Sequence, residues 1–262
     1  MKRFITKTAF GNLQIAAVLV VAASAPAFAA PTLAPSDPIV RKAPTWHPPV
    51  VADIKTQAVD WLQKNGKDPA AQSKAISIIA GIGDKADGTE LLDRLGEAFA
   101  TVDPGTAQLV DLCSRPRARA VLPSFPWLTD AKSAPILAAN MRLYFGRWLA
   151  QGQWFEEALE QIGTLKPADV VAPAELLFYQ GVAYHRLLNK DEGLKVINQL
   201  IDGAEFSPRR YVAVAMLMQA DLSSLEPDSL DHIARRMDDN AGRLDHGRAG
   251  PKVKKVEDGI VE

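Results

Sequence analysis

The sequence predicts an all-α protein, and two observations carry that prediction. From about residue 51 onward, apolar residues recur at the three- and four-residue spacing of a helix, and no segment alternates apolar and polar residues as a half-buried strand would. Start and stop signals also separate these segments. Asp103-Pro104 combines an N-cap with a proline at the first helical position, and Gly203 follows an apolar segment as a C-cap. We therefore expect antiparallel helical hairpins joined by short loops.

The N-terminal residues 1–29 have the pattern of a secretory signal peptide. Three basic residues precede the apolar run 15–23, and Ala27-Phe-Ala29 offers small residues for cleavage. The apolar run is shorter than the ~20 residues that cross a bilayer. An uncleaved anchor is the alternative interpretation, and it is the only membrane contact that we expect. The protein is therefore predicted to be exported, to the periplasm or to the exterior.

The composition bounds the class of protein. The 262 residues are 47% hydrophobic and 23% charged, as in a soluble globular protein. Cleavage after residue 29 removes three basic residues and no acidic one, which leaves 27 basic and 31 acidic residues. A mildly acidic chain without a basic stripe argues against a nucleic-acid partner. Cys113 is the only cysteine, so the fold must hold without a disulfide.

The N-terminal half is expected to hold a linker and four helices. Residues 30–50 are proline-rich and predict an extended linker. Residues 51–133 predict an N-terminal helical bundle that ends in a proline-rich loop at 114–133, where Phe125 and Trp127 are expected to contact the body. The helices are marked by Val59, Trp61 and Leu62; by Ala75, Ile76, Ile78 and Ile79; by Leu91, Leu92, Leu95, Phe99 and Val102; and by Leu109, Val110 and Leu112.

Residues 134–246 predict three helical hairpins in succession. Pro135, Pro173 and Pro208 mark the starts of the first helices, and Lys166-Pro167 and Gly203 end the second helices of the first two pairs. Their apolar positions are Leu137, Met141, Tyr144 and Trp148; Phe155, Ala158, Leu159, Ile162 and Leu165; Leu177, Tyr184 and Leu188; Leu194, Ile197, Leu200 and Ile201; Tyr211, Ala215, Met218 and Leu222; and Leu230, Ile233, Ala234 and Met237.

Small residues recur at one place in these hairpins. Gly146 and Gly181 are 35 residues apart, and Ala215 follows 34 residues later. A glycine inside a helix costs about 1 kcal/mol relative to alanine, so its reuse requires a compensating gain. We expect that gain to be the close approach of a second helix over the missing side chain. A period of this length indicates a repeat array.

The hairpins resemble the tetratricopeptide repeat. The matching residues of the two best copies are Gly146, Leu149, Phe155, Glu157, Ala158 and Ile162, and then Gly181, Tyr184, Gly193, Ile197 and Leu200. The opening aromatic place of the repeat is occupied by Arg142, Leu177 and Tyr211 instead of tryptophan, and Pro227 marks the third copy as a degraded or capping pair. The resemblance implies a short superhelix over residues 135–245. The whole chain also resembles exported bacterial proteins that carry such repeats and have no assigned activity.

The resemblance also implies a partner-binding surface. In such arrays the first helix of each pair lines a groove that binds a peptide. Because this face carries arginines beside Phe178 and Met216, an acidic, partly apolar segment of a protein partner is expected here. The polar and aromatic positions of this face are Asn140, Arg147, Glu175, Phe178, His185, Arg186, Arg209 and Gln219. Leu143, Val182, Val212 and Met216 are its apolar positions. An ordinary surface, or one covered by the N-terminal helices, is the alternative interpretation.

No catalytic set is apparent in the sequence. The four histidines are scattered, none is spaced for a zinc site, and no phosphate-binding glycine motif or nucleophile elbow is present. We expect no cofactor, no metal and no catalytic residue, and we interpret the protein as a non-catalytic scaffold or adaptor. Two alternatives stay open. One is an exported enzyme that uses the Cys113 thiol, although Cys113 lies at the apolar end of a predicted helix. The other is a structural protein that self-associates through the charged amphipathic tail 247–262.

Overall fold

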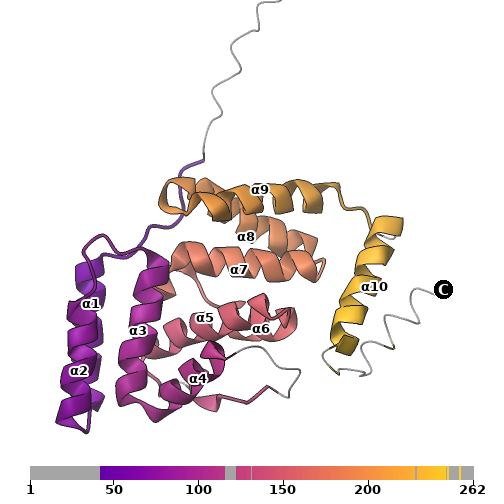
Figure 1. The fold of residues 1–262 in the computed structure, drawn as a ribbon. Helices are drawn as coiled ribbons and strands as arrows, with labels where there is room; N and C mark the ends of the chain where they lie inside the picture. Colours follow the sequence, from indigo (N-terminus) through magenta and orange to yellow (C-terminus); the bar gives the residue numbers. More distant parts are fainter. Residues whose placement is uncertain are drawn as a thin grey trace, which may run out of the picture. The chain divides into compact units, whose positions relative to one another are not determined.

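The structure is a computed structural model that describes residues 42–115, 122–130, 132–227 and 229–245, with Gly247 and Lys254. These residues contain ten α-helices and no strand, which confirms the all-α prediction (Figure 1). None of the described helices has the length and apolar character needed to cross a membrane. The predicted signal peptide and nearly all of the predicted tail lie outside the described residues. The helices are α1 Val51–Asn65, α2 Pro69–Ala80, α3 Gly88–Val102, α4 Pro104–Ser114, α5 Pro135–Gln151, α6 Phe155–Ile162, α7 Pro173–Arg186, α8 Lys190–Asp202, α9 Arg209–Ser224 and α10 Leu230–Asp245.

Side chains at the helix starts explain where several helices begin. Asp68, Asp87 and Asp103 accept hydrogen bonds from backbone N–H groups in the first turns of α2, α3 and α4. The predicted start at Asp103-Pro104 is confirmed, because the Asp103 carboxylate accepts from the backbone N–H of Thr106 at 2.6 Å. The chain therefore fixes these boundaries by local chemistry.

The helices form a stack of pairs that is compatible with a helical-repeat fold. Helices α5 and α6 pack together as one hairpin, and α7 and α8 as the next. Helices α5, α7 and α9 lie side by side in that order, and α3 runs across their direction and packs on α5 and α7 (Figure 1). The N-terminal helices therefore pack directly on the stack. The described residues form one compact unit.

The two central hairpins reverse direction in the same way, 35 residues apart. Gln153 and Leu188 have positive φ angles of 67° and 57° at equivalent places in the two turns. The backbone N–H of Trp154 donates to Leu149 at 2.9 Å, and that of Asn189 donates to Tyr184 at the same distance. These matching turns show that the 35-residue period of the sequence is a period of the backbone as well.

Close helix packing at the two glycines confirms the reason for their reuse. A Cβ atom on Gly146 would overlap Cγ2 of Ile162 in α6. A Cβ atom on Gly181 would lie 3.0 Å from Cγ1 of Ile197 in α8. Ala215 in α9 is fully buried. The absent side chains therefore let the helices of each pair approach closely.

The third pair departs from this pattern. Ser223 lies 35 residues after Leu188, yet α9 stays helical through Ser224 and does not turn there. The turn that closes the first two pairs is thus absent here, and α10 begins only after Pro227. Helix α10 therefore lies apart from α9, across the ends of the preceding helices, where Arg243 contacts Glu156 at the start of α6 (Figure 1).

The prediction of a buried apolar stripe on α10 is wrong, because the helix turns this stripe away from the stack. Leu230 and Met237, predicted to be in the core, are 86% and 55% exposed. The face of α10 toward the stack instead carries polar side chains, among them Arg235 and Arg243. The stripe has the spacing of a buried helix face, but no hairpin forms that would cover it.

Residues 42–50 correct the expectation of an unpacked linker. Trp46 is buried, and its indole N–H donates to the backbone oxygen of Gln199 in α8 at 3.0 Å. Its ring lies directly over Gly203, where a Cβ atom would be only 2.5 Å away. The Gln199 side chain also donates to the hydroxyl of Thr45 at 3.0 Å. This strap, residues 42–50, joins the start of the described chain to the end of α8.

Replacing Gly146 by alanine should lower the free energy of unfolding by about 1–3 kcal/mol, because the overlap with Ile162 forces α5 and α6 apart. The matched control is Gly242→Ala in α10, where no atom lies within 4 Å of the added Cβ. That change should stabilise the helix by up to about 1 kcal/mol. Denaturant unfolding followed by circular dichroism measures both. Effects of the same sign would contradict the close packing.

Candidate functional site

Two of the predicted groove residues belong to a buried ion-pair network instead. Arg147 on α5 pairs with Glu175 on α7 at 3.0 Å and with Asp93 on α3 at 2.5 Å. The Glu175 side chain is 2% exposed, and the hydroxyl of Thr89 donates to its second oxygen at 2.8 Å. These charges are used to join three helices, so they are not presented to a partner.

The charge state of Arg147 follows from its surroundings. Burial lowers the pKa of the guanidinium, but the negative charges of Glu175 and Asp93 outweigh this effect and raise the pKa above its usual value. Arg147 therefore stays protonated across the whole physiological range. A permanently charged, buried group must keep its partners, which indicates a structural role.

Asn140 is also placed inside the protein. Its side-chain N–H donates to the backbone oxygen of Ile136 at 2.7 Å, and its side-chain oxygen accepts from the backbone N–H of Val171 at 2.9 Å. The oxygen of the amide thus holds the segment that leads into α7, and its N–H group bonds within α5.

Replacing Arg147 by alanine should destabilise the protein by about 3–5 kcal/mol, because it leaves the Glu175 carboxylate buried without its cation. The matched control is Arg94→Ala, since Arg94 pairs with Glu97 on the exposed surface of α3. Its cost should be no more than about 1 kcal/mol. Equal losses of stability for the two variants in thermal or denaturant unfolding would contradict a stabilising role of this ion-pair network.

The remaining predicted residues do not form one continuous groove. The Phe178 ring stacks on Tyr211 with centroids 4.3 Å apart, and Gln219 donates to Asn198 of α8. Arg209 is exposed at the start of α9. His185 and Arg186 lie together at the end of α7, where a cleft opens next to α10.

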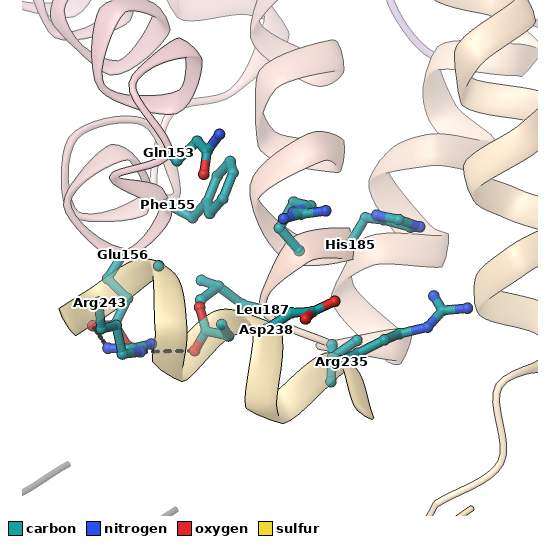
Figure 2. Close-up of a pocket in the computed structure, with 12 residues that line it drawn as sticks. Gln153, Phe155, Glu156, His185, Leu187, Arg235, Asp238 and Arg243 are labelled. Carbon is teal, nitrogen blue, oxygen red and sulfur yellow. Dashed lines mark hydrogen bonds and ion pairs between the residues drawn. The ribbon is translucent and has the colours of Figure 1, made fainter. Parts of the chain in front are cut away.

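This cleft, called the α10 cleft below, separates α10 from the ends of the two central hairpins (Figure 2). It has one lobe of about 160 Å³ and a second of about 410 Å³. Figure 2 shows Phe155 and Leu187 on the hairpin side and Arg235 and Arg243 on the α10 side of the smaller lobe. The residues that line both lobes are Glu156, Arg186, Leu187, Leu188, Asp239 and Arg243.

Most charged groups of the cleft neutralise one another. Arg243 pairs with Glu156 at 2.8 Å and with Asp239 at 2.7 Å. Arg186 and Arg236, which line the larger lobe, have no carboxylate within ion-pair distance among the described residues, and Arg186 lies over the Phe155 ring at 5.6 Å. The cleft therefore has an excess of positive charge beside apolar side chains.

Sequence reasoning included His185 and Arg186 but missed the contribution of α10. Arg236 and Arg243 are seven residues apart and hence share one face of that helix, opposite the apolar stripe. That spacing is the signal that predicts a charged face. Nothing in the sequence placed this face against the ends of α6 and α7.

A second cavity of about 210 Å³ lies under the strap, beside the N-terminal ends of α3, α7 and α9. Its lining is mainly apolar, with Trp46, Pro49 and Phe206 among the residues. Its polar members Thr89 and Glu175 bond each other. The carboxylate of Asp87, the N-cap of α3, also lines this cavity, and no cation among the described residues does, so it is the weaker candidate for an acidic ligand.

A charged contact holds α10 at its observed place. Arg235 of α10 bonds both carboxylate oxygens of Asp221 in α9, and the Nε2 atom of His185 in α7 lies 2.7 Å from the same carboxylate. The hydrogen bond from Arg235, supported by His185, lowers the pKa of Asp221 to about 2. This contact, called the Asp221 latch below, closes one end of the α10 cleft.

Replacing Asp221 by asparagine should loosen α10 at neutral pH, because the ion pair with Arg235 is lost. In the unchanged protein the latch should be complete above an ordinary carboxyl pKa of ~3.9 and should weaken as the pH falls toward about 2, since protonation of Asp221 removes its charge. Hydrogen exchange of α10 measures both effects. Equal exchange of α10 in both proteins at neutral pH would contradict the latch.

The described residues contain no group of three or more His, Cys, Asp or Glu side chains placed to hold a metal ion. Cys113 on α4 is partly buried and packs against the main hydrophobic core, which also includes Leu109 of the same helix.

Comparison with protein-family models, with curated proteins and with solved structures gave no match to this chain. The assignment of a stack of helix pairs therefore rests on the geometry of the chain itself.

Proposed function

We propose that the protein is an exported, non-catalytic scaffold of tetratricopeptide-like hairpins that binds a protein or peptide partner in the α10 cleft. The export rests on the signal-peptide pattern of residues 1–29. The kinship with the tetratricopeptide repeat is supported by the shared positions Gly146 and Gly181 and by the equivalent turns at Gln153 and Leu188.

One observation carries the choice of the cleft. Arg186 and Arg236 line its larger lobe without a carboxylate partner among the described residues, while the acids of that lobe are engaged by Arg243. A guanidinium binds a carboxylate through two parallel hydrogen bonds, and such pairs are strong where water is partly excluded. The cleft thus fits a ligand that brings its own acidic groups.

Apolar surface in the same lobe defines the rest of the ligand. Leu159, Leu187 and Leu188 line it next to the two arginines. Binding energy in protein interfaces concentrates in a few apolar or arginine anchors that fill pockets. The expected partner segment is therefore acidic and partly apolar, and it binds at the hairpin ends, away from the predicted groove whose residues Arg147 and Glu175 bind each other.

The double variant Arg186→Ala/Arg236→Ala should lose the partner while keeping the fold, because neither side chain makes an ion pair with the described residues. Wild type, this variant and the control Arg94→Ala would each capture proteins from a cell-envelope extract by chemical cross-linking. We expect proteins with acidic contact segments to be captured by wild type and control, and to fall at least tenfold with the double variant. A tenfold fall corresponds to about 1.4 kcal/mol of binding free energy. Unchanged capture by the double variant would contradict the cleft as the binding site.

A further inference from the structure

The outer face of α9 is apolar and uncovered. Leu217, Met216 and Val214 are 72%, 54% and 40% exposed, and Ala213 and Ala220 lie exposed on the same side. The opposite side of α9 is buried against α7 and α8. In a stack of helix pairs the next helix covers this outer side, and a terminal helix normally has a polar outer face. The face of α9 has the composition of an internal surface although it ends the stack.

The chain's own α10 does not provide the cover. It is held across the hairpin ends by Arg235 with Asp221 at one end and by Arg243 with Glu156 at the other. Its polar side faces the stack, and its apolar stripe faces away from it. None of the described residues covers the α9 face, which is therefore open to another molecule while the Asp221 latch is closed.

Near the middle of the helix the exposed apolar residues of this face are arranged symmetrically, although Val214 has Gln219 as its counterpart. In α9, Arg209–Ser224, the midpoint falls between Met216 and Leu217, which are two of its most exposed apolar side chains. Ala213 and Ala220 lie at equal distances on either side of this midpoint. A second α9 running in the opposite direction would therefore place Leu217 next to the partner's Met216 and Ala213 next to the partner's Ala220. Such self-complementarity is what a two-fold interface requires.

The charges at the ends of α9 favour the same antiparallel pairing. Arg209 and Arg210 are exposed in its first turn, where positive charge opposes the helix dipole. Glu226 follows the C-terminal end and is also exposed. In an antiparallel pair the basic end of each helix lies beside the partner's C-terminal end, whose carbonyl groups and acid attract it. A parallel pair would bring like charges together.

We propose that the protein dimerises about a two-fold axis at Met216 and Leu217, with the outer faces of two α9 helices packed antiparallel. The occupant of this face is thus a second copy of the chain. Helix α9 is 16 residues long, or about 24 Å, so the pair is smaller than a standard protein interface. We accordingly expect a dissociation constant in the micromolar range, and the α10 cleft is left open to its own partner.

The first test measures mass by light scattering and sedimentation over a concentration series, with residues 30–262. The segment 1–29, the expected signal peptide, is omitted. We expect a reversible dimer, and Leu217→Arg should raise its dissociation constant at least tenfold with unchanged helix content. The matched control Leu230→Arg, at the exposed leucine of α10, should leave the dimer intact. A monomer at all concentrations, or loss of the dimer in the control alone, would overturn the proposal.

Removal of residues 247–262 separates this interface from association through the tail. The shortened chain should dimerise as the longer one does, because the α9 face is unchanged. A dimer that requires the tail would overturn the assignment to α9.

The second test fixes the direction of the helices with cysteines in a Cys113→Ser background. Ala213→Cys chains mixed with Ala220→Cys chains should form a disulfide-linked dimer under mild oxidation, whereas neither chain alone should do so. The two positions face each other only in the antiparallel register, and a disulfide needs Cβ atoms about 4 Å apart. Cross-linking of each variant with itself would indicate a parallel pair. Absence of any cross-link while the dimer mass persists would place the interface elsewhere. Either result would overturn the proposal.

Discussion

In each central hairpin the two helices touch at a place where one of them has no side chain. Ile162 of α6 fills the space over Gly146, and Ile197 of α8 fills the space over Gly181. Because the contact occurs at the same place in both hairpins, the turns and the helix directions repeat as well. The row of helices α5, α7 and α9 depends on this repetition, and so do the charges that this row and α3 bring together. The two glycines lower the helix propensity of α5 and α7, and the close packing that they permit offsets this cost.

The point where the repetition ends creates both surfaces that we propose as interfaces. The backbone turns at Gln153 and at Leu188, but it continues as a helix through Ser223 and Ser224. In the structure α10 does not pack along α9. It lies across the hairpin ends and leaves the α10 cleft on one side, while the outer face of α9 loses the helix that would cover it. The absence of a turn at Ser223 thus goes together with both the charged α10 cleft and the exposed apolar face of α9.

The arginines show how position decides what one residue type does. Arg147 is enclosed between Glu175 and Asp93, so its charge holds three helices together. Arg186 extends from the end of α7 next to Phe155 and has no carboxylate partner among the described residues. Both residues satisfied the same sequence criterion for a groove position. The neighbouring helices supply the acids in one case and an aromatic ring in the other, and these neighbours are distant in the sequence.

Local chemistry was sufficient to predict the helical class, the start at Asp103-Pro104 and the close packing at Gly146, because caps and helix spacing depend on residues a few positions apart. It was not sufficient for the strap at Trp46, whose partner Gln199 is 153 residues away. Nor was it sufficient for α10, whose apolar spacing is the same whether a neighbour covers it or not. Contacts between distant segments decided where charges are buried and which helix faces stay exposed. Burial depends on the packing of the whole chain, and the pattern of one segment does not show which other segment packs against it.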